Sequence, residues 1–270
     1  MSLSSFTRSI ALKLPAVLRD GIVKNFINIP ACFGDYGNYA ELEYGSKSYW
    51  SAYMQSTLEA ILAHQATSDF QILPRNLACY TALSLAASDA EEGIRVLDIG
   101  GGAGYEFFSA ASIFRNVPVS QWIVIEQTEL VGHIQSNFEH PILRYQADLN
   151  NIASKIDLVI LSGSLQYLPN PMKTLEEALA LNPSHVVISR TPYWDKSFRL
   201  TKQLGWKHIN GPDGKRLAYP FWVLAEREVA RLFSSSYRKV LDCHDGQLMY
   251  VSKHGFLPYR SLIFQRISDA

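Results

Sequence analysis

The sequence is poor in cysteine and has no long apolar run. Its three cysteines, Cys32, Cys79 and Cys243, lie far apart without C-x-x-C spacing. They cannot all pair, and we expect reduced thiols in a cytoplasmic protein. No run of about 18 apolar residues is present, and the N-terminus lacks the basic-then-apolar order of a secretory signal. We therefore expect a protein without stable membrane insertion.

An excess of either charge is also absent. Lys and Arg together number 25, as do Asp and Glu, so no overall positive field would attract a nucleic-acid backbone and no nucleic-acid partner is predicted. The sequence contains neither an internal repeat nor a low-complexity tract. Its 270 residues, 47% of them hydrophobic, suit one sizeable globular core with an appended segment.

A glycine-rich stretch, 95–105, interrupts an apolar run. The apolar run contains one acid, Asp98, and is followed by glycines and then by a helix-like segment. This order predicts a strand, a tight turn and the start of a helix. Gly100, Gly102 and Gly104 let the backbone turn sharply and bring a ligand close to main-chain N–H groups. The stretch therefore predicts a ligand-binding loop.

Two common nucleotide-binding motifs are missing from this loop. The third glycine of a dinucleotide fingerprint is replaced by Tyr105 or Phe107, depending on where the motif starts, and no Gly-Lys-Ser/Thr follows. An oxidoreductase would have to bind nicotinamide despite this broken fingerprint. The spacing of Asp98, Gly100, Gly102 and Gly104 instead resembles the first motif of class I S-adenosylmethionine-dependent methyltransferases. In that family the loop passes under the amino-acid part of the cofactor.

From Arg95 onward, short apolar runs alternate with helical segments, which predicts parallel strands joined by crossovers. Two later runs, 237–241 and 261–265, predict final strands joined by a loop over 242–259. A closing antiparallel hairpin of this kind matches the class I methyltransferase fold. We thus predict an α/β, doubly wound, Rossmann-like sheet of seven strands over 91–270, with a polar insertion at about 194–222. The five parallel runs are 95–99, 122–125, 142–145, 157–161 and 185–189.

Residues 1–90 show no strand pattern and predict an N-terminal helical extension. Phe6, Ile10 and Leu14 have helical spacing, and a second amphipathic helix is expected to run through Leu62. Between them, 31–39 is rich in turn formers and aromatic residues and is interpreted as a loop. This aromatic segment could close over a cofactor as a lid or simply pack the extension against the core.

In an open α/β sheet the ligand lies beyond the carboxyl ends of the strands, where several polar residues of this chain should converge. Glu126 lies 22 residues after Gly104 and suits the vicinal hydroxyls of a ribose. Asp148 can accept from an adenine amino group, and the Leu149 N–H can donate to a ring nitrogen. Their order matches the family's ribose and adenine positions. The predicted S-adenosylmethionine-binding residues are Asp98, Gly100, Gly101, Gly102, Gly104, Glu126, Gln127, Asp148, Leu149 and Ser162.

The segment 162–169 resembles the one that borders cofactor and acceptor in small-molecule methyltransferases, but its familiar histidine is replaced by Gln166 and Tyr167. Neither side chain is an obvious base near neutral pH. Arg190 suits an anionic group, although a structural salt bridge would explain it equally well. The predicted acceptor-binding residues are Gln166, Tyr167, Arg190, Tyr193 and Tyr36, with Trp50 as a further candidate.

The catalytic base is the weakest part of the sequence prediction. Tyr167 and His244 are the candidates, and His244 lies beside Asp242 and Asp245. The run Cys243-His244-Asp245 gives only a weak metal signal, because no distant ligands complement it, and no metal site is predicted.

A narrower resemblance connects the aromatic block around Phe33–Tyr36 with the glycine loop, 125–127 and 162–168. Together these segments resemble a family of bacterial methyltransferases associated with surface-polysaccharide biosynthesis. The acceptor itself does not carry over from that family, but by this association we expect O-methylation of a small-molecule or carbohydrate-type acceptor. Because the base is missing, the alternative is a non-catalytic protein that binds S-adenosylmethionine, S-adenosylhomocysteine or a partner on a methyltransferase scaffold.

Overall fold

The computed structural model of the protein describes residues 15–26, 30–42, 74–90, 92–113, 118–150, 152, 155–194, 198–204 and 218–267. Its strands are β1 (Ala31–Tyr36), β2 (Ile94–Ile99), β3 (Val119–Ile125), β4 (Leu143–Gln146), β5 (Leu158–Ser162), β6 (His185–Trp194), β7 (Arg199–Leu204), β8 (Ala218–Ala225), β9 (Tyr237–Val251) and β10 (Gly255–Arg266). Its helices are α2 (Ala16–Phe26), α4 (Leu77–Ser88), α5 (Tyr105–Ile113), α6 (Thr128–Gln135), α7 (Pro171–Ala180) and α8 (Glu226–Phe233), with 3₁₀ turns η1 (Tyr39–Leu42), η2 (Pro74–Asn76) and η3 (Leu165–Tyr167).

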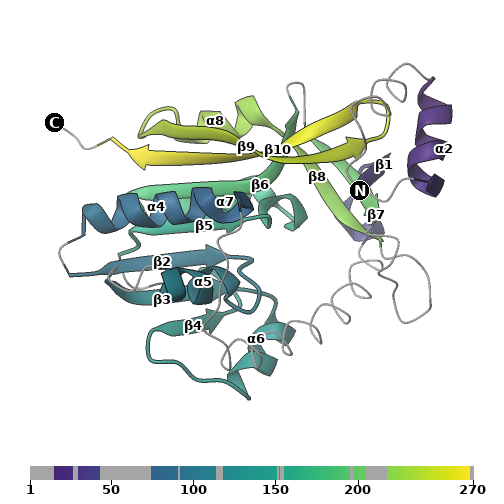
Figure 1. The fold of residues 1–270 in the computed structure, drawn as a ribbon. Coiled ribbons are helices and arrows are strands. Elements are labelled where there is room, and N and C mark those ends of the chain that lie inside the picture. The colour runs from purple at the N-terminus through teal and green to yellow at the C-terminus, as the bar shows by residue number, and fades with distance from the viewer. Residues whose placement is uncertain are drawn as a thin grey trace.

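The centre of the sheet is parallel, in the order β4-β3-β2-β5-β6, and it continues into the antiparallel strands β10 and β9 (Figure 1). All five residues of β5 are buried, and β2 is buried at five of six positions. Such continuous apolar runs are typical of strands covered on both faces. The α/β class, the five parallel strands and the closing hairpin predicted from the sequence are therefore confirmed.

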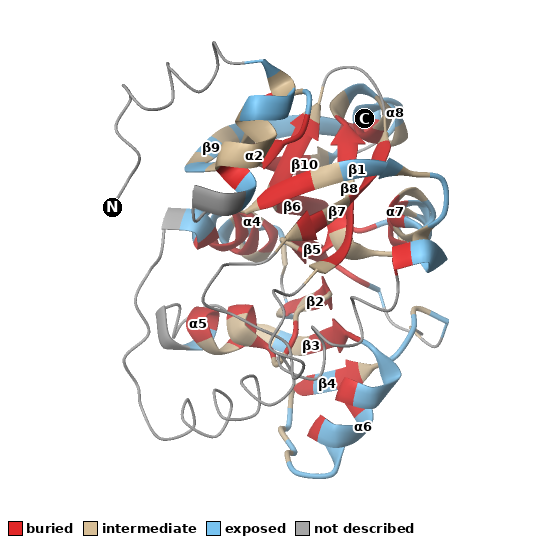
Figure 2. Ribbon diagram, turned by 90° about the vertical axis from the view of Figure 1, so that its right-hand side faces the viewer, coloured by how far each residue is buried: buried red, intermediate tan, exposed pale blue. Residues whose placement is uncertain are grey.

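Helices cover both faces of this sheet. Side chains of α4, α5 and α6 pack with Val96, Trp122 and Ile160 on one face. On the other face, α7 and α8 pack with Leu97 and Val159. Buried strands lie between helices whose outer surfaces are exposed (Figure 2). The doubly wound arrangement brings the carboxyl ends of the parallel strands, and the loops that follow them, to one edge of the sheet.

The predicted count of seven strands is too low, because the described sheet has ten strands. Strands β7 and β8 pair with each other inside the segment predicted as a polar insertion, and β8 runs parallel to the end of β6. Strand β1 lies where a loop was predicted, and it pairs with β7 and β9. Gly34, at φ 79°, lies where the β1–β7 register shifts. Turn-forming residues thus sit in an irregular strand, since pairing on both sides outweighs local preference.

The closing hairpin is longer than predicted. Strand β9 continues to Val251 and β10 begins at Gly255, so the predicted loop over 242–259 is wrong for most of its length. Many residues of β9 between Arg238 and Gln247 are exposed. Polar side chains on an exposed strand face gave this part of the sequence the composition of a loop.

Two helices precede the first parallel strand in the described part of the chain. Helix α4 packs on β5, β6 and β10 and belongs to the main core. Helix α2 lies against β9, where Asp20 accepts hydrogen bonds from the hydroxyls of Tyr250 and of Ser252, at 2.5 and 2.6 Å. The helices predicted around Phe6–Leu14 and through Leu62 lie outside the described residues.

Candidate functional site

The glycine loop connects β2 to α5, and three of its residues have left-handed backbone conformations. The φ angles of Gly100, Gly102 and Gly104 are 71°, 59° and 84°, which side chains with a Cβ rarely adopt. A Cβ on Gly100 would also lie 2.4 Å from the Cβ of Ser164, and one on Gly101 would lie 2.5 Å from the Asp98 carboxyl carbon. The loop therefore requires glycine for conformation and for space.

Glu126 directly follows β3 and contacts this loop. Its Oε1 accepts a hydrogen bond from the Gly102 N–H at 3.1 Å, and its Oε2 accepts one from the Gln127 N–H at 3.0 Å. Burial raises the pKa of the Glu126 carboxyl, and these two backbone donors partly offset the shift. The structure thus brings together the glycine loop and the acid that the sequence assigned to a ribose. A carboxylate held this way has lone pairs left to accept from hydroxyl groups.

Asp98 lies under the loop and is fully buried. Trp122 Nε1 donates to one of its oxygens at 3.4 Å, and the other oxygen has no partner among the described residues. Burial, and next the neighbouring Glu106 carboxylate, raise the pKa of Asp98 well above its ordinary value. Unpaired buried acceptors of this kind are costly and are often found where a ligand binds.

Glu106 and Asn76 form a buried polar network that was not predicted. Asn76 Nδ2 and Ser162 Oγ donate to Glu106 Oε1 at 2.7 and 2.9 Å, and Ser189 Oγ donates to Ser162 Oγ at 3.0 Å. The side chain of Ser162, predicted to bind cofactor, is thus directed to Glu106. No spacing in the sequence connects positions 76, 106, 162 and 189, because only the packing of η2, α5, β5 and β6 brings them together.

The predicted adenine-side residues follow β3 and β4 at the same edge of the sheet. Asp148 is exposed, and its Oδ1 accepts from the Asn150 N–H at 2.9 Å, as in an Asx turn. Leu149 is half-buried against the core, and Gln127 is exposed before α6. Their contact with adenine stays a prediction.

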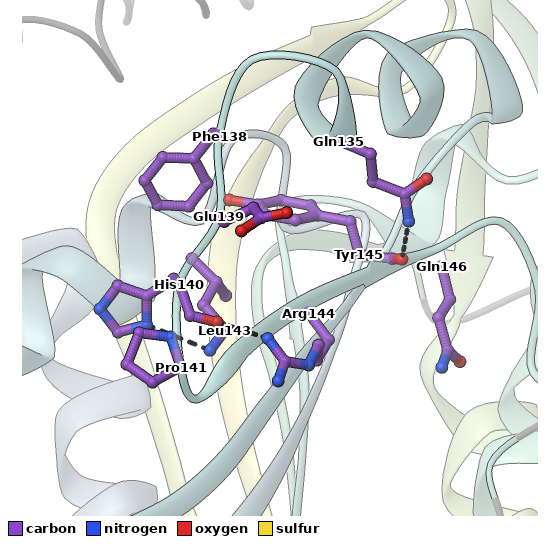
Figure 3. A pocket seen from close by; sticks show the side chains of 9 residues that line it. All are labelled: Gln135, Phe138, Glu139, His140, Pro141, Leu143, Arg144, Tyr145 and Gln146. Carbon is purple, nitrogen blue, oxygen red and sulfur yellow. Dashed lines mark hydrogen bonds between the residues drawn. The ribbon is translucent and has the colours of Figure 1, made fainter.

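An open groove of ≈ 860 Å³ lies at the outer edge of β4 rather than at the glycine loop (Figure 3). No predicted cofactor residue lines it. Gln135, from the end of α6, donates to the Tyr145 carbonyl at 2.9 Å across this groove, which caps one acceptor of an edge strand. The groove is lined by Gln135, Phe138, Glu139, His140, Pro141, Leu143, Arg144, Tyr145 and Gln146.

The η3 turn after β5 connects the sheet edge to the additional strands. Tyr167 donates its hydroxyl hydrogen to Gln203 Oε1 at 3.0 Å, and its carbonyl accepts from the Tyr39 hydroxyl at 2.7 Å. Gln166 is buried, accepts from Thr191 Oγ1 and donates to the Arg190 carbonyl. The aromatic N-terminal block therefore contacts the predicted acceptor segment through Tyr39.

Arg190 has an unusual backbone conformation at the end of the parallel sheet. Its φ is 52°, and its guanidinium lies against Gly163, where an added Cβ would be 3.1 Å from Nε. Nη2 donates to the Ser162 carbonyl at 2.6 Å. In the described part of the chain no carboxylate forms an ion pair with Arg190, so the structural salt bridge considered from the sequence is not found there.

The other predicted acceptor residues lie in different surroundings. Tyr193 is buried in the core under the guanidinium of Arg260, 5.8 Å from its ring centroid. Tyr36, on β1, has its ring over Gly34 and 5.9 Å from the Lys202 ammonium. Trp50 lies outside the described residues.

A protein-family model described as a methyltransferase domain matches residues 73–240, more than half of the chain. The chain belongs to this methyltransferase family. Membership confirms the methyltransferase resemblance and the S-adenosylmethionine cofactor expected from the glycine loop. No curated protein matches the sequence.

Several solved structures are similar in fold to this methyltransferase domain. The N-terminal domain of EvdMO1 with S-adenosylhomocysteine bound is 14% identical, with 73% of this chain and 82% of that chain covered and a TM-score of 0.47. The amino pentose methyltransferase CalS10 from Micromonospora echinaspora is 11% identical, with 78% and 96% covered and a TM-score of 0.45. Likeness of this size does not identify the acceptor of the chain.

The match to the methyltransferase family ends at Val240, before most of β9 and all of β10. His244, the predicted base, lies on β9 and is exposed, whereas Asp245 beside it is half-buried. Among the described residues, no cluster of three or more metal-ligating side chains occurs, and no helix has the length and apolar character needed to cross a membrane.

Proposed function

We propose that this methyltransferase domain transfers a methyl group from S-adenosylmethionine to a hydroxyl group of a small, carbohydrate-type acceptor. The observation that carries the proposal is the contact between Glu126 and the Gly102 N–H, at a loop whose three glycines have positive φ. The narrower resemblance to bacterial enzymes of surface-polysaccharide biosynthesis belongs to the same proposal and supports a sugar-type acceptor.

The residues of the loop fit this cofactor chemically. Glu126 offers a carboxylate to the ribose hydroxyls, and Asp98 offers a buried oxygen without a partner among the described residues. The N–H groups of Gly100, Gly102 and Gly104 donate within the protein, so these glycines provide space for the amino-acid part rather than hydrogen-bond donors. When bound, S-adenosylmethionine supplies an electrophilic methyl group on a sulfonium. The chain's own task is to align an acceptor oxygen with it and to exclude water.

Calorimetric titration tests the cofactor assignment. We expect micromolar binding of S-adenosylmethionine and S-adenosylhomocysteine and no binding of reduced nicotinamide dinucleotide, which serves as the control. Substitution of Gly102 by Asp adds bulk and negative charge beside the cofactor and should abolish binding. Unchanged affinity in Gly102→Asp, or binding of the nicotinamide dinucleotide, would contradict the loop assignment.

A second measurement separates an enzyme from a non-catalytic scaffold. We expect the purified protein to release S-adenosylhomocysteine when S-adenosylmethionine is supplied with a cell-extract acceptor pool. A catalytically silent protein that still binds both compounds would instead support the scaffold alternative. The Gly102→Asp protein is the background control for this assay.

A further inference from the structure

The η3 turn lies directly against the glycine loop, and Ser164 makes the contact. Ser164 is the N-cap residue of η3, but its side chain does not cap the turn. Its Oγ instead donates to the carbonyl of Ile99, the last residue of β2, at 2.5 Å. A Cβ on Gly100 would lie 2.4 Å from the Cβ of Ser164, so the loop packs closely on this serine. Ser164 therefore supports one side of the loop.

Two hydrogen bonds hold the same loop from the β3 side. The Gly100 N–H donates to the Ile125 carbonyl at 2.8 Å, and the Gly102 N–H donates to Glu126 at 3.1 Å. The loop is thus held between β3 and Ser164. Because glycines have no side chain to anchor them, the loss of either support should let the loop shift into the space that the cofactor needs.

The other end of η3 is held by elements outside the parallel sheet. The Tyr167 N–H donates to the Ser164 carbonyl at 2.8 Å, which closes the turn. The Tyr167 carbonyl accepts from the Tyr39 hydroxyl at 2.7 Å, and the Tyr167 hydroxyl donates to Gln203 on β7 at 3.0 Å. The Tyr167 ring lies 5.5 Å from the ring of Tyr219 on β8, centroid to centroid. Three separate elements, η1, β7 and β8, thus fix the residue that closes η3.

Direct hydrogen bonds of 2.5 to 2.8 Å connect η1 to the glycine loop. They run from the Tyr39 hydroxyl to the Tyr167 carbonyl, from the Tyr167 N–H to the Ser164 carbonyl, and from Ser164 Oγ to the Ile99 carbonyl. The N-terminal end of this series is fixed as well, because β1, just before Tyr39, pairs with β7 and β9. Rigid elements joined by such contacts can transmit a small displacement from one site to another.

We propose that Ser164 is a positioning residue for the cofactor loop, and that Tyr39 acts on the loop through Ser164. Neither side chain has to touch the cofactor for this role. The η3 turn belongs to the predicted acceptor segment 162–169, so a change on the acceptor side would reach the cofactor loop through the same bonds. Cofactor and acceptor should therefore influence each other's affinity. The inference rests on the proposed place of S-adenosylmethionine at the glycine loop.

Calorimetric titration of the full-length protein with S-adenosylhomocysteine tests the two residues without an acceptor. Ser164→Ala removes the donor to Ile99 and should weaken binding by about 5-fold or more, the size expected for one hydrogen bond. Tyr39→Phe keeps the aromatic ring but removes the hydroxyl, and it should weaken binding by about 3-fold or more.

Two matched controls remove equivalent hydrogen bonds at the opposite edge of the sheet. Ser184 Oγ donates to the Asp157 carbonyl at 2.7 Å, and the Tyr237 hydroxyl donates to the Pro183 carbonyl at 2.9 Å. Ser184→Ala and Tyr237→Phe should leave the affinity within about 2-fold of the wild-type value, because they are distant from the loop. Equal losses of affinity in the controls would overturn the positioning role.

The double variant tests whether Tyr39 acts through Ser164. When the Ser164 hydroxyl is already absent, loss of the Tyr39 hydroxyl should have little further effect. The double variant should thus bind S-adenosylhomocysteine within about 2-fold of Ser164→Ala alone. A loss equal to the product of the two single effects would show that Tyr39 acts independently of Ser164, and it would overturn this part of the proposal.

Hydrogen–deuterium exchange of the ligand-free protein separates positioning from a general loss of stability. In Ser164→Ala and Tyr39→Phe, amides of the loop segment 99–105 should exchange faster, while amides of the buried strand β6 should exchange as in the wild-type protein. The control variants should leave the loop unchanged. Faster exchange by the same factor in both segments would mean that the fold as a whole is destabilised, which would contradict a positioning role.

Unchanged affinity in Ser164→Ala would overturn the assignment of Ser164. Failure of S-adenosylhomocysteine to bind the wild-type protein, or equal binding to Gly102→Asp, would instead count against the proposed function itself. The two failures are therefore distinguishable.

Discussion

Substitution of Gly100 tests whether the loop requires glycine at this residue. Gly100→Ala forces a Cβ into the left-handed region, at φ 71° and 2.4 Å from Ser164 Cβ, and should lower the free energy of unfolding by about 2–4 kcal/mol. Gly132→Ala, in α6, meets nothing within 4 Å and should be neutral or stabilise by up to about 1 kcal/mol. Urea unfolding of both variants measures the difference. Similar losses in the two proteins would contradict a special requirement at Gly100.

Glu126 tests the proposed ribose contact. Glu126→Gln should weaken binding of S-adenosylmethionine by about 10- to 100-fold, because hydrogen bonds to a charged group contribute about 1.5–3 kcal/mol. The matched control is Glu129→Gln, at an exposed position in the first turn of α6. Calorimetry gives both affinities, and unchanged binding in Glu126→Gln would exclude the contact.

The pKa of Glu126 adds a pH dependence to the same site. Burial raises this pKa in the folded protein, so the carboxyl is protonated at a higher pH than an ordinary glutamate. Protonation removes acceptor capacity. Wild-type affinity for the cofactor should therefore fall as pH is lowered through the raised pKa. The Glu126→Gln protein should not show this component in titrations between pH 4 and 8.

At the scale of elements, Arg260 connects the closing hairpin to α8. It donates to both carboxylate oxygens of Glu226 and to Asp242 on β9, where Oδ2 is 2.5 Å from Nη2. The Arg260 hydrogen bonds hold the pKa of Glu226 below its ordinary value. Burial by itself would raise the pKa of Asp242, but hydrogen bonds from Arg260 and Lys239 outweigh this effect and lower the pKa. Both carboxyls are partly exposed, so solvent weakens these contacts.

Arg260→Met keeps a long side chain over Tyr193 but removes the charge. The pKa values of Glu226 and Asp242 are both lowered in the folded protein. The folding stability that these carboxylates contribute is therefore fully present above their unfolded-state pKa values, and it is lost as the pH falls through their folded-state pKa values. The variant should lose about 1 kcal/mol at pH 7 and approach wild-type stability near pH 3. Lys173→Met, which breaks the exposed pair with Glu177, is the control and should change little. A pH-independent loss in Arg260→Met would mean that packing dominates.

For the whole molecule, cofactor binding should stabilise the fold, since β2, β3 and α5 all meet at the site. A ligand at 100 times its Kd adds about 2.7 kcal/mol of stability, which raises Tm by about 5–11 °C for a chain of this size. We expect this shift with S-adenosylhomocysteine and none with reduced nicotinamide dinucleotide, measured by differential scanning calorimetry. Gly102→Asp should show no shift with either compound.

Local patterns were enough to predict the parallel strands and the glycine loop of the proposed cofactor site. The parallel strands are continuous apolar runs, and Gly100, Gly102 and Gly104 occupy one short segment, so both signals lie within a few neighbouring residues. Glu126 could be placed because the carboxyl ends of parallel strands share one edge. Strands β1 and β7 and the full length of β9 could not be predicted, because their turn-forming and polar residues form strands only through their partners.

The sequence by itself predicted the methyltransferase family and its cofactor, and it singled out the glycine loop and the acid that contacts it. Only the tertiary structure decided the surroundings of the predicted acceptor residues. It buries Tyr193 in the core, leaves His244 exposed on β9, and places the Arg190 guanidinium against Gly163. The physical reason is that strand alternation sends neighbouring side chains to opposite faces, while contacts between distant strands depend on pairing register rather than on local composition.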